Sequence, residues 1–185
     1  MDNGASSYLR FLKGDDNAFV EIIRDYKDGL ILYLNGFTGN IQRSEELAED
    51  TFVKLVTKRP RFDNKASFKT WLYTIGRNVA IDSLRRGAKR KTVPLAEAVS
   101  LPDEEEELER AYIQEEDKIA LHRAMGSLPS DYRVVLWLTY FEGFSNKEAA
   151  VVMKKSVRSV ETLLYRARQK LKSELIKEGF VYEEL

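Results

Sequence analysis

The sequence contains no cysteine and a single histidine, His122. The lack of cysteine excludes disulfides, thiol nucleophiles and thiolate metal sites, and it fits a reducing compartment. One histidine without cysteine supplies too few groups for a histidine-based catalytic triad or a zinc site. We therefore expect a protein that is not an enzyme and that holds no metal or cofactor.

Long apolar runs are also missing. No stretch approaches the roughly 20 apolar residues that a membrane helix requires. The first ten residues, MDNGASSYLR, lack the basic region and apolar core of a signal peptide. The sequence therefore predicts a cytoplasmic protein that is neither exported nor membrane-spanning.

Proline is scarce, and between the four prolines apolar residues recur at spacings of three and four. This periodicity predicts an all-α fold. The expected helices lie near residues 15–35, 44–58, 67–86, 115–126, 130–142, 146–153 and 157–177. The chain of 185 residues suits one larger or two small domains.

Segment 92–114 separates the helices into two halves. It contains two prolines, an unbroken acidic run from Asp103 to Glu107, and Glu109. Crowded like charges resist burial, so this segment is expected to be a flexible acidic linker between two small helical domains, 1–91 and 115–185. It is either a solvated tether or an acidic strand, and such a strand would mimic nucleic acid in a basic channel or shield the protein's own DNA-binding surface until a partner displaces it.

The charges balance at 30 basic and 30 acidic residues, but they are unevenly distributed. Five of the seven residues in 85–91 are basic, and 154–172 holds seven basic residues and one acid. Two separated basic patches are expected of a protein that contacts the DNA backbone at two places. Basic residues at helix ends also complement the helix dipole, which is the plainer reading.

A helix-turn-helix is predicted near the C-terminus. Ser145 and Glu148 have the spacing of a capping box, and Ser156 is placed to cap a second helix after a short turn. Polar and basic side chains at the start of a second helix suit the DNA major groove, since Arg can bond guanine through two hydrogen bonds and Glu can accept from cytosine. The alternative is a helical hairpin with a solvated face. The candidate contacts to duplex DNA are Lys155, Arg158, Ser159, Glu161, Thr162, Tyr165, Arg166 and Arg168.

Residues 130–142 are expected to support this hairpin, with Gly143 ending the helix. The apolar spacing predicts that Val134, Val135, Leu138 and Phe141 pack beneath it. Trp137 and Tyr140 are also expected in the core, as large aromatic residues at helical spacing usually are.

The helix expected at 67–86, capped by Ser67, has a core face that carries Phe68, Leu72, Ile75 and Val79, with Trp71 beside it. Its other face and the preceding loop combine basic, aromatic and amide side chains, which suits stacking on unpaired bases and holding their backbone. A solvated face is the competing interpretation. The candidate contacts to single-stranded DNA are Phe62, Asn64, Lys69, Tyr73, Arg77, Asn78, Arg85 and Arg86.

Four carboxylates, Glu45, Glu46, Glu49 and Asp50, share one side of the helix expected at 44–58. No histidine or second cluster completes a metal site with them. They form either a surface for a basic protein partner or a solvated acidic face.

The order of these segments resembles the extracytoplasmic-function (ECF) sigma factors of bacterial RNA polymerase. The resemblance rests on SEELAEDTF at 44–52, RFD at 61–63, SFKTWLYTIGRNVAID at 67–82, Leu128-Pro129, and the helix 156–171 that ends YRARQKL. It covers nearly the whole chain apart from the linker and the last few residues.

The resemblance implies a sigma region 2 domain at 1–91, a linker at 92–114, and a region 4 domain at 115–185. Region 2 would bind the clamp helices of the polymerase β′ subunit through the acidic face, and would open the −10 element and capture a flipped base with Asn78. Region 4 would read the −35 element and contact the β flap. The family also implies an anti-sigma factor as a partner.

Two other classes remain as alternatives to a sigma factor. One is a stand-alone helix-turn-helix regulator that acts without binding polymerase, with the N-terminal half as a sensor or dimerisation domain. The other is a nucleic-acid enzyme with a carboxylate metal set near the basic face. Dependence on core polymerase distinguishes the first from a sigma factor, and activity with a divalent metal would favour the second.

Overall fold

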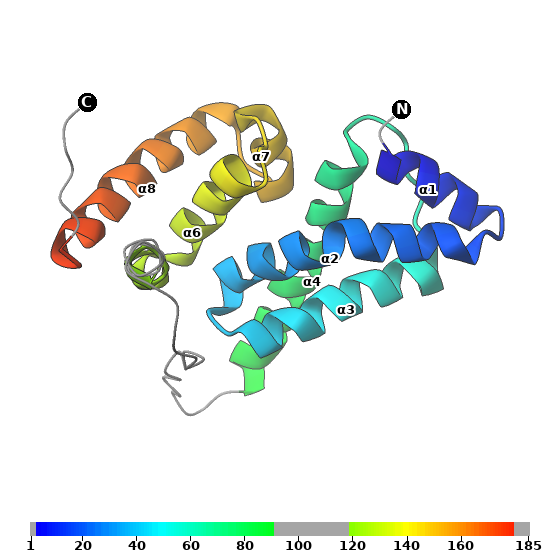
Figure 1. The fold of residues 1–185 in the computed structure, drawn as a ribbon, viewed down its shortest axis with the longest axis horizontal. Helices are drawn as coiled ribbons and strands as arrows, with labels where there is room; N and C mark the ends of the chain where they lie inside the picture. Colours follow the sequence, from blue (N-terminus) through cyan, green and yellow to red (C-terminus); the bar gives the residue numbers. More distant parts are fainter. Residues whose placement is uncertain (1–2, 91–118, 180–185) are drawn as a thin grey trace, which may run out of the picture.

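The computed structural model describes residues 3–90 and 119–179, and within these ranges every regular element is a helix. The N-terminal unit comprises α1 (Asn3–Leu12), α2 (Asp16–Thr38), α3 (Ile41–Lys58) and α4 (Phe68–Arg90). The C-terminal unit comprises helical residues 119–127, α6 (Ser130–Leu136), the π-helical turn η1 (Trp137–Phe141), α7 (Asn146–Met153) and α8 (Val157–Lys177). Figure 1 shows the two units. The predicted all-α fold is confirmed, whereas the acidic linker lies outside the described residues.

Apolar side chains from α2, α3 and α4 form the centre of the N-terminal unit. Leu30, Leu34, Leu55 and Leu72 are fully buried there, and of these Leu72 is one of the predicted core residues. Burial of each such side chain stabilises the fold by roughly 1.5–3 kcal/mol relative to leaving it exposed.

The first helix, α1, was absent from the predicted set. Tyr8 anchors it: this side chain is fully buried, and its hydroxyl donates to the Pro60 carbonyl at 2.7 Å. Its ring centroid lies 5.7 Å from that of Phe68 and 5.1 Å from that of Trp71. Burial raises the pKa of Tyr8 to about 12.

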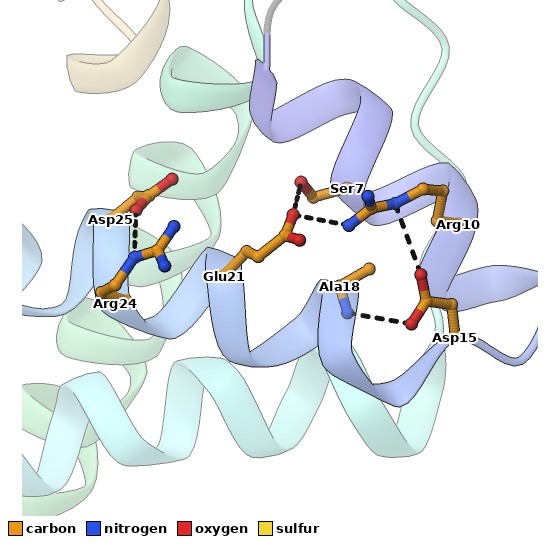
Figure 2. Close-up of polar contacts among 7 residues, drawn as sticks. All are labelled: Ser7, Arg10, Asp15, Ala18, Glu21, Arg24 and Asp25. Carbon is orange, nitrogen blue, oxygen red and sulfur yellow. Dashed lines mark hydrogen bonds and ion pairs between the residues drawn. The ribbon is translucent and has the colours of Figure 1, made fainter.

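Polar contacts hold α1 to the next helix (Figure 2). The Glu21 carboxylate accepts hydrogen bonds from Ser7 Oγ at 2.7 Å and from Arg10 at 2.6 Å. The Arg10 hydrogen bond, followed by that of Ser7, lowers the pKa of Glu21. Asp15 caps α2 and also lies 3.5 Å from Arg10 Nε. The buried Tyr8 side chain and these polar contacts to α2 therefore hold α1 in place together.

The predicted helix caps of the C-terminal unit are confirmed. Ser145 and Glu148 form a reciprocal capping box, and Ser156 Oγ accepts from the Ser159 amide at 3.1 Å. Lys154 ends α7 in the left-handed conformation, with φ of 53°. Gly143 ends the preceding helical segment with φ of 70°, a conformation that favours glycine.

Part of the core expected beneath the hairpin was wrong. Val134, Val135 and Leu138 are buried and Trp137 packs against the core, as predicted. Tyr140 and Phe141, however, are 57% and 51% exposed. The π-helical turn η1 accommodates one more residue per hydrogen-bonded turn than an α-helix, which shifts Tyr140 and Phe141 out of the expected register.

The two units pack together, α6 against α2 and α7 against α4 (Figure 1). Their buried apolar side chains form one continuous cluster. A Cβ atom added to Gly36 of α2 would lie 3.0 Å from Val134 Cγ2, so the absence of a side chain allows this close approach.

Candidate nucleic-acid interface

The second helix of the helix-turn-helix, α8, presents the predicted duplex-binding residues outward. Val160 and Leu164 are buried against the rest of the unit. All eight candidate contacts are exposed: Lys155, Arg158, Ser159, Glu161, Thr162, Tyr165, Arg166 and Arg168. An open surface groove lies along the first three turns, lined by Ser156, Arg158, Ser159, Thr162, Leu163 and Arg166. The polar face therefore lies at the end of the helix that suits major-groove reading.

Local contacts orient the edges of this surface. Thr162 Oγ1 donates to the Arg158 carbonyl at 2.9 Å, one turn earlier. Lys155 Nζ lies 3.1 Å from an Asp131 carboxylate oxygen. The Arg168 guanidinium lies 5.3 Å from the centroid of the Tyr140 ring, so this exposed aromatic residue supports a basic side chain at the far edge.

The predicted single-strand surface is partly accessible. Asn64, in the loop before α4, is exposed, as are Arg85 and Arg86 on α4. Arg77 and Asn78, also on α4, are half-buried. Asn64 has φ of 57°, and a left-handed conformation of this kind turns the loop before α4. These five residues leave a basic and amide-bearing surface open to solvent.

Phe62 does not lie on that surface. It is only 9% exposed, and its ring centroid lies 5.8 Å from that of Phe68 and 5.2 Å from that of Trp71. Its apolar ring gains more from this aromatic cluster than from exposure on a loop. A stacking contact to DNA from Phe62 stays a prediction, and it would require this ring to leave the core.

Tyr73 and Lys69 also differ from the expected exposed face. Tyr73 is 1% exposed, with its ring centroid 5.0 Å from that of Tyr33 and 5.3 Å from that of Phe144 of the C-terminal unit. Lys69 Nζ lies 2.8 Å from Glu142 Oε2. The C-terminal unit thus covers this side of α4, which helix periodicity alone does not reveal.

Burial has a clear electrostatic effect on Tyr73. Loss of solvation raises the pKa of its phenol far above the ordinary value, and the neighbouring Glu142 carboxylate raises it further. Tyr73 is therefore neutral over the physiological range in this arrangement.

The acidic face of α3 is exposed at all four predicted positions, Glu45, Glu46, Glu49 and Asp50. Two valines that the sequence analysis did not select extend this face: Val53 is 57% exposed and Val56 is 39% exposed. The available signal was helical spacing: Val53 lies four residues after Glu49, and Val56 lies three residues after Val53. Exposed apolar residues beside carboxylates suit contact with a protein partner.

Across the described residues, no group of three or more His, Cys, Asp and Glu side chains is placed to hold a metal ion. Within the same ranges, no helix is long and apolar enough to cross a membrane.

Comparison with known proteins assigns families to both units. The model described as Sigma-70 region 2 matches residues 22–90, and the model described as Sigma-70, region 4 matches residues 118–171. The ECF RNA polymerase sigma factor SigM of Bacillus subtilis (strain 168) is 30% identical over 160 residues, which cover 83% of this chain and 92% of SigM.

Solved structures agree with the fold. CnrH, in complex with the cytosolic domain of CnrY, is 26% identical with a TM-score of 0.67, and the match covers 95% of this chain and 99% of CnrH. The sigma factor RpoE from Bartonella quintana, in complex with the anti-sigma factor NepR, is 23% identical with a TM-score of 0.69. That match covers 86% of this chain and 96% of RpoE, and it shows a shared fold.

Proposed function

The chain belongs to the ECF group of the sigma-70 family, and from this premise we propose which of its surfaces contact polymerase and which contact promoter DNA. As a sigma factor it is a transcription initiation factor and not an enzyme. Matches to both region 2 and region 4 disfavour a stand-alone regulator. We propose domain limits of 1–91 and 115–185, with a linker at 92–114.

The recognition helix α8 reads the −35 element in duplex form. The observation that carries this assignment is the exposure of all eight candidate side chains at the start of α8 and in the turn before it. Arg158 and Arg166 line the same groove and can each bond a guanine edge. Glu161 accepts from a cytosine amino group rather than contacting phosphate.

The loop before α4 and the outer side of α4 bind the −10 element as single strand. Asn64, Arg77, Asn78, Arg85 and Arg86 form the accessible part of this surface. Asn78 has both a donor and an acceptor for the edge of a flipped base. Flipping a base costs a few kcal/mol, which stacking and edge hydrogen bonds offset.

The acidic face of α3 binds core RNA polymerase, through the clamp helices of the β′ subunit. Its four exposed carboxylates suit basic residues on that partner, and Val53 and Val56 add apolar area. Exposed apolar residues of region 4, among them Tyr140 and Phe141, contact the β flap.

An anti-sigma factor restrains the protein in the cytoplasm until it is needed. Support comes from CnrH, which was solved in complex with the cytosolic domain of another protein, CnrY. Such a partner would compete with polymerase for the acidic face of α3 and for the exposed apolar residues of region 4.

Run-off transcription tests this function. Core RNA polymerase is incubated with fragments of the source genome, with and without the protein, and new transcripts are mapped to give the −10 and −35 sequences. Changing both Arg158 and Arg166 to Ala should abolish these transcripts. Each lost base contact weakens specific binding by about 1–3 kcal/mol, or roughly fivefold to 150-fold.

Arg123→Ala combined with Lys177→Ala is the matched control, since it also removes two exposed positive charges from the C-terminal unit. This control should transcribe normally. The absence of discrete transcripts from the unmodified protein, together with the absence of a stable complex with core polymerase, would refute the proposed function.

A further inference from the structure

We propose that the packing of the two units is a closed state in which the C-terminal unit occupies the −10 surface of α4 as an intramolecular substitute for DNA. The Glu142 carboxylate takes the place of a phosphate at Lys69, and the Phe144 ring takes the place of a base at Tyr73. This inference rests on the proposed function, because it requires that Lys69 and Tyr73 contact the −10 strand.

The Glu142 contact is a partly buried ion pair with several further hydrogen bonds. The Glu142 side chain is 10% exposed and the Lys69 side chain 33% exposed, with Nζ 2.8 Å from Oε2. Lys69 Nζ also donates to the Glu142 backbone carbonyl at 2.9 Å, and Trp137 Nε1 donates to Glu142 Oε1 at 3.2 Å. Lysine binds carboxylate and phosphate through the same charge-assisted hydrogen bonds, so one anion excludes the other.

The π-helical turn positions this carboxylate. The Glu142 amide donates to the Trp137 carbonyl at 3.1 Å, a spacing of five residues. The same two residues are joined by the indole hydrogen bond, so η1 fixes both the backbone and the side chain of Glu142. Turns of this kind occur often at functional sites.

The Phe144 contact completes the resemblance to a nucleotide. Phe144 is 6% exposed, and its ring centroid lies 5.3 Å from that of Tyr73. Lys69 Nζ lies 5.3 Å from the Phe144 centroid and 5.8 Å from the Tyr73 centroid. An aromatic ring against a tyrosine, with a cation beside an anion, is the arrangement by which proteins bind single-stranded DNA.

A second contact between the two units, at a distance from Lys69 and Glu142, also stabilises the closed state. Arg133 Nε of α6 donates to the Gly36 carbonyl of α2 at 3.1 Å, and Val134 approaches Gly36 directly. The recognition helix α8 stays exposed in the same arrangement. The closed state therefore covers part of the −10 surface while leaving the −35 surface open.

This arrangement predicts that the open fraction sets the affinity for single-stranded DNA. When only a fraction of molecules is competent, the apparent Kd rises by the inverse of that fraction. Glu142→Gln removes the charge that pairs with Lys69 and should weaken the closed state. We expect about tenfold tighter binding of the variant, which corresponds to a closed population near 90% in the unmodified protein.

The measurement is fluorescence anisotropy without polymerase, using a labelled single-stranded oligonucleotide that spans the −10 element mapped by run-off transcription. Glu178→Gln, which removes the same charge at the far end of α8, is the matched control and should leave the affinity unchanged. Equal affinities for Glu142→Gln and the unmodified protein would overturn the proposal.

A reversible lock provides the opposite test. Because the chain has no cysteine, Gly36→Cys with Val134→Cys allows one disulfide only, at a position where the two residues already approach within the reach of such a bond. The oxidised form should lose the −10 oligonucleotide and keep a duplex carrying the −35 element. Reduction should restore binding of the single strand.

The two probes separate the possible outcomes. Unchanged single-strand binding after oxidation, or loss of both probes, would overturn the closed state as described. Transcription by the unmodified protein would leave the proposed function intact in either case. Where the double-cysteine variant does not fold, the Glu142→Gln measurement decides.

Discussion

The two surfaces assigned to DNA differ in what covers them. On α8 every candidate side chain is exposed, whereas on α4 Tyr73 is 1% exposed and Lys69 is paired with a residue of the other unit. Both helices have a polar face opposite an apolar one. The difference shows that an amphipathic pattern predicts exposure only for a helix whose polar face has no neighbour in the fold.

Two buried polar residues of α4 support this conclusion. Thr70 and Ser83 are polar but buried, with 0% and 7% exposure. The hydroxyl of each is hydrogen-bonded within the fold: that of Thr70 to the Ser67 hydroxyl at 2.8 Å, and that of Ser83 to the Arg43 guanidinium, which donates to it. Buried hydroxyl groups with partners cost little, so a polar helix face can be covered without a large penalty.

Tyrosines on the two surfaces give the largest expected contrast. Tyr73→Ala should lower the free energy of unfolding by about 3–5 kcal/mol, because it leaves a cavity between the two units. Tyr165→Ala, at a position that is 64% exposed, should change it by less than about 0.5 kcal/mol. Urea denaturation followed by circular dichroism measures both. Similar small losses for the two variants would place Tyr73 on a free surface and break the comparison.

Arginines provide a second, smaller contrast. Arg133 donates to the carbonyls of Gly36, Gly126 and Leu128, so it joins the two units and the start of α6. Arg133→Ala should cost about 1.5–3 kcal/mol of stability, the range for hydrogen bonds to a charged group. Arg158→Ala should leave the unfolding midpoint unchanged while it weakens duplex binding. A stable Arg133→Ala variant would show that this interunit contact contributes little.

The caps of the hairpin are the next test. Ser156→Ala removes the acceptor for the Ser159 amide at the start of α8, and it should cost about 1 kcal/mol. Ser156→Asp restores an acceptor and should recover most of this loss. Thermal unfolding of the three proteins gives the comparison. If Asp and Ala behave alike, the hydroxyl of Ser156 acts otherwise than as a cap.

Local signals in the sequence predicted much of this structure. The capping serines, the glycine stop and the spacing of Val160 and Leu164 all act within a few residues, and the helix-turn-helix formed as they indicate. Features that depend on distant contacts were missed. Helix α1 depends on Tyr8 reaching Pro60, fifty-two residues away, and Tyr73 depends on Phe144.

The π-helical turn η1 is a local feature that was nevertheless missed. It is local, but nothing in the spacing of residues 130–142 distinguishes it from a regular helix. Its hydrogen bond from Glu142 to Trp137 coincides with the contact of Glu142 to Lys69, so packing of the two units and the turn support each other. Tyr140 and Phe141 are exposed for this reason, although their hydrophobicity indicates a core position.

Acidification gives the smallest expected effect, and it sharpens the comparison within the N-terminal unit alone. The pKa of Glu21 is lowered in the folded protein, first by the Arg10 hydrogen bond and then by that of Ser7. Its contribution to stability is therefore present above the unfolded-state value near 4.5 and is lost as pH falls through the folded-state pKa. The unmodified protein should be slightly more stable than Glu21→Gln at pH 7, and this difference should shrink at pH 3. A difference of equal size at both pH values would show that Glu21 holds α1 through packing, and not through its charge.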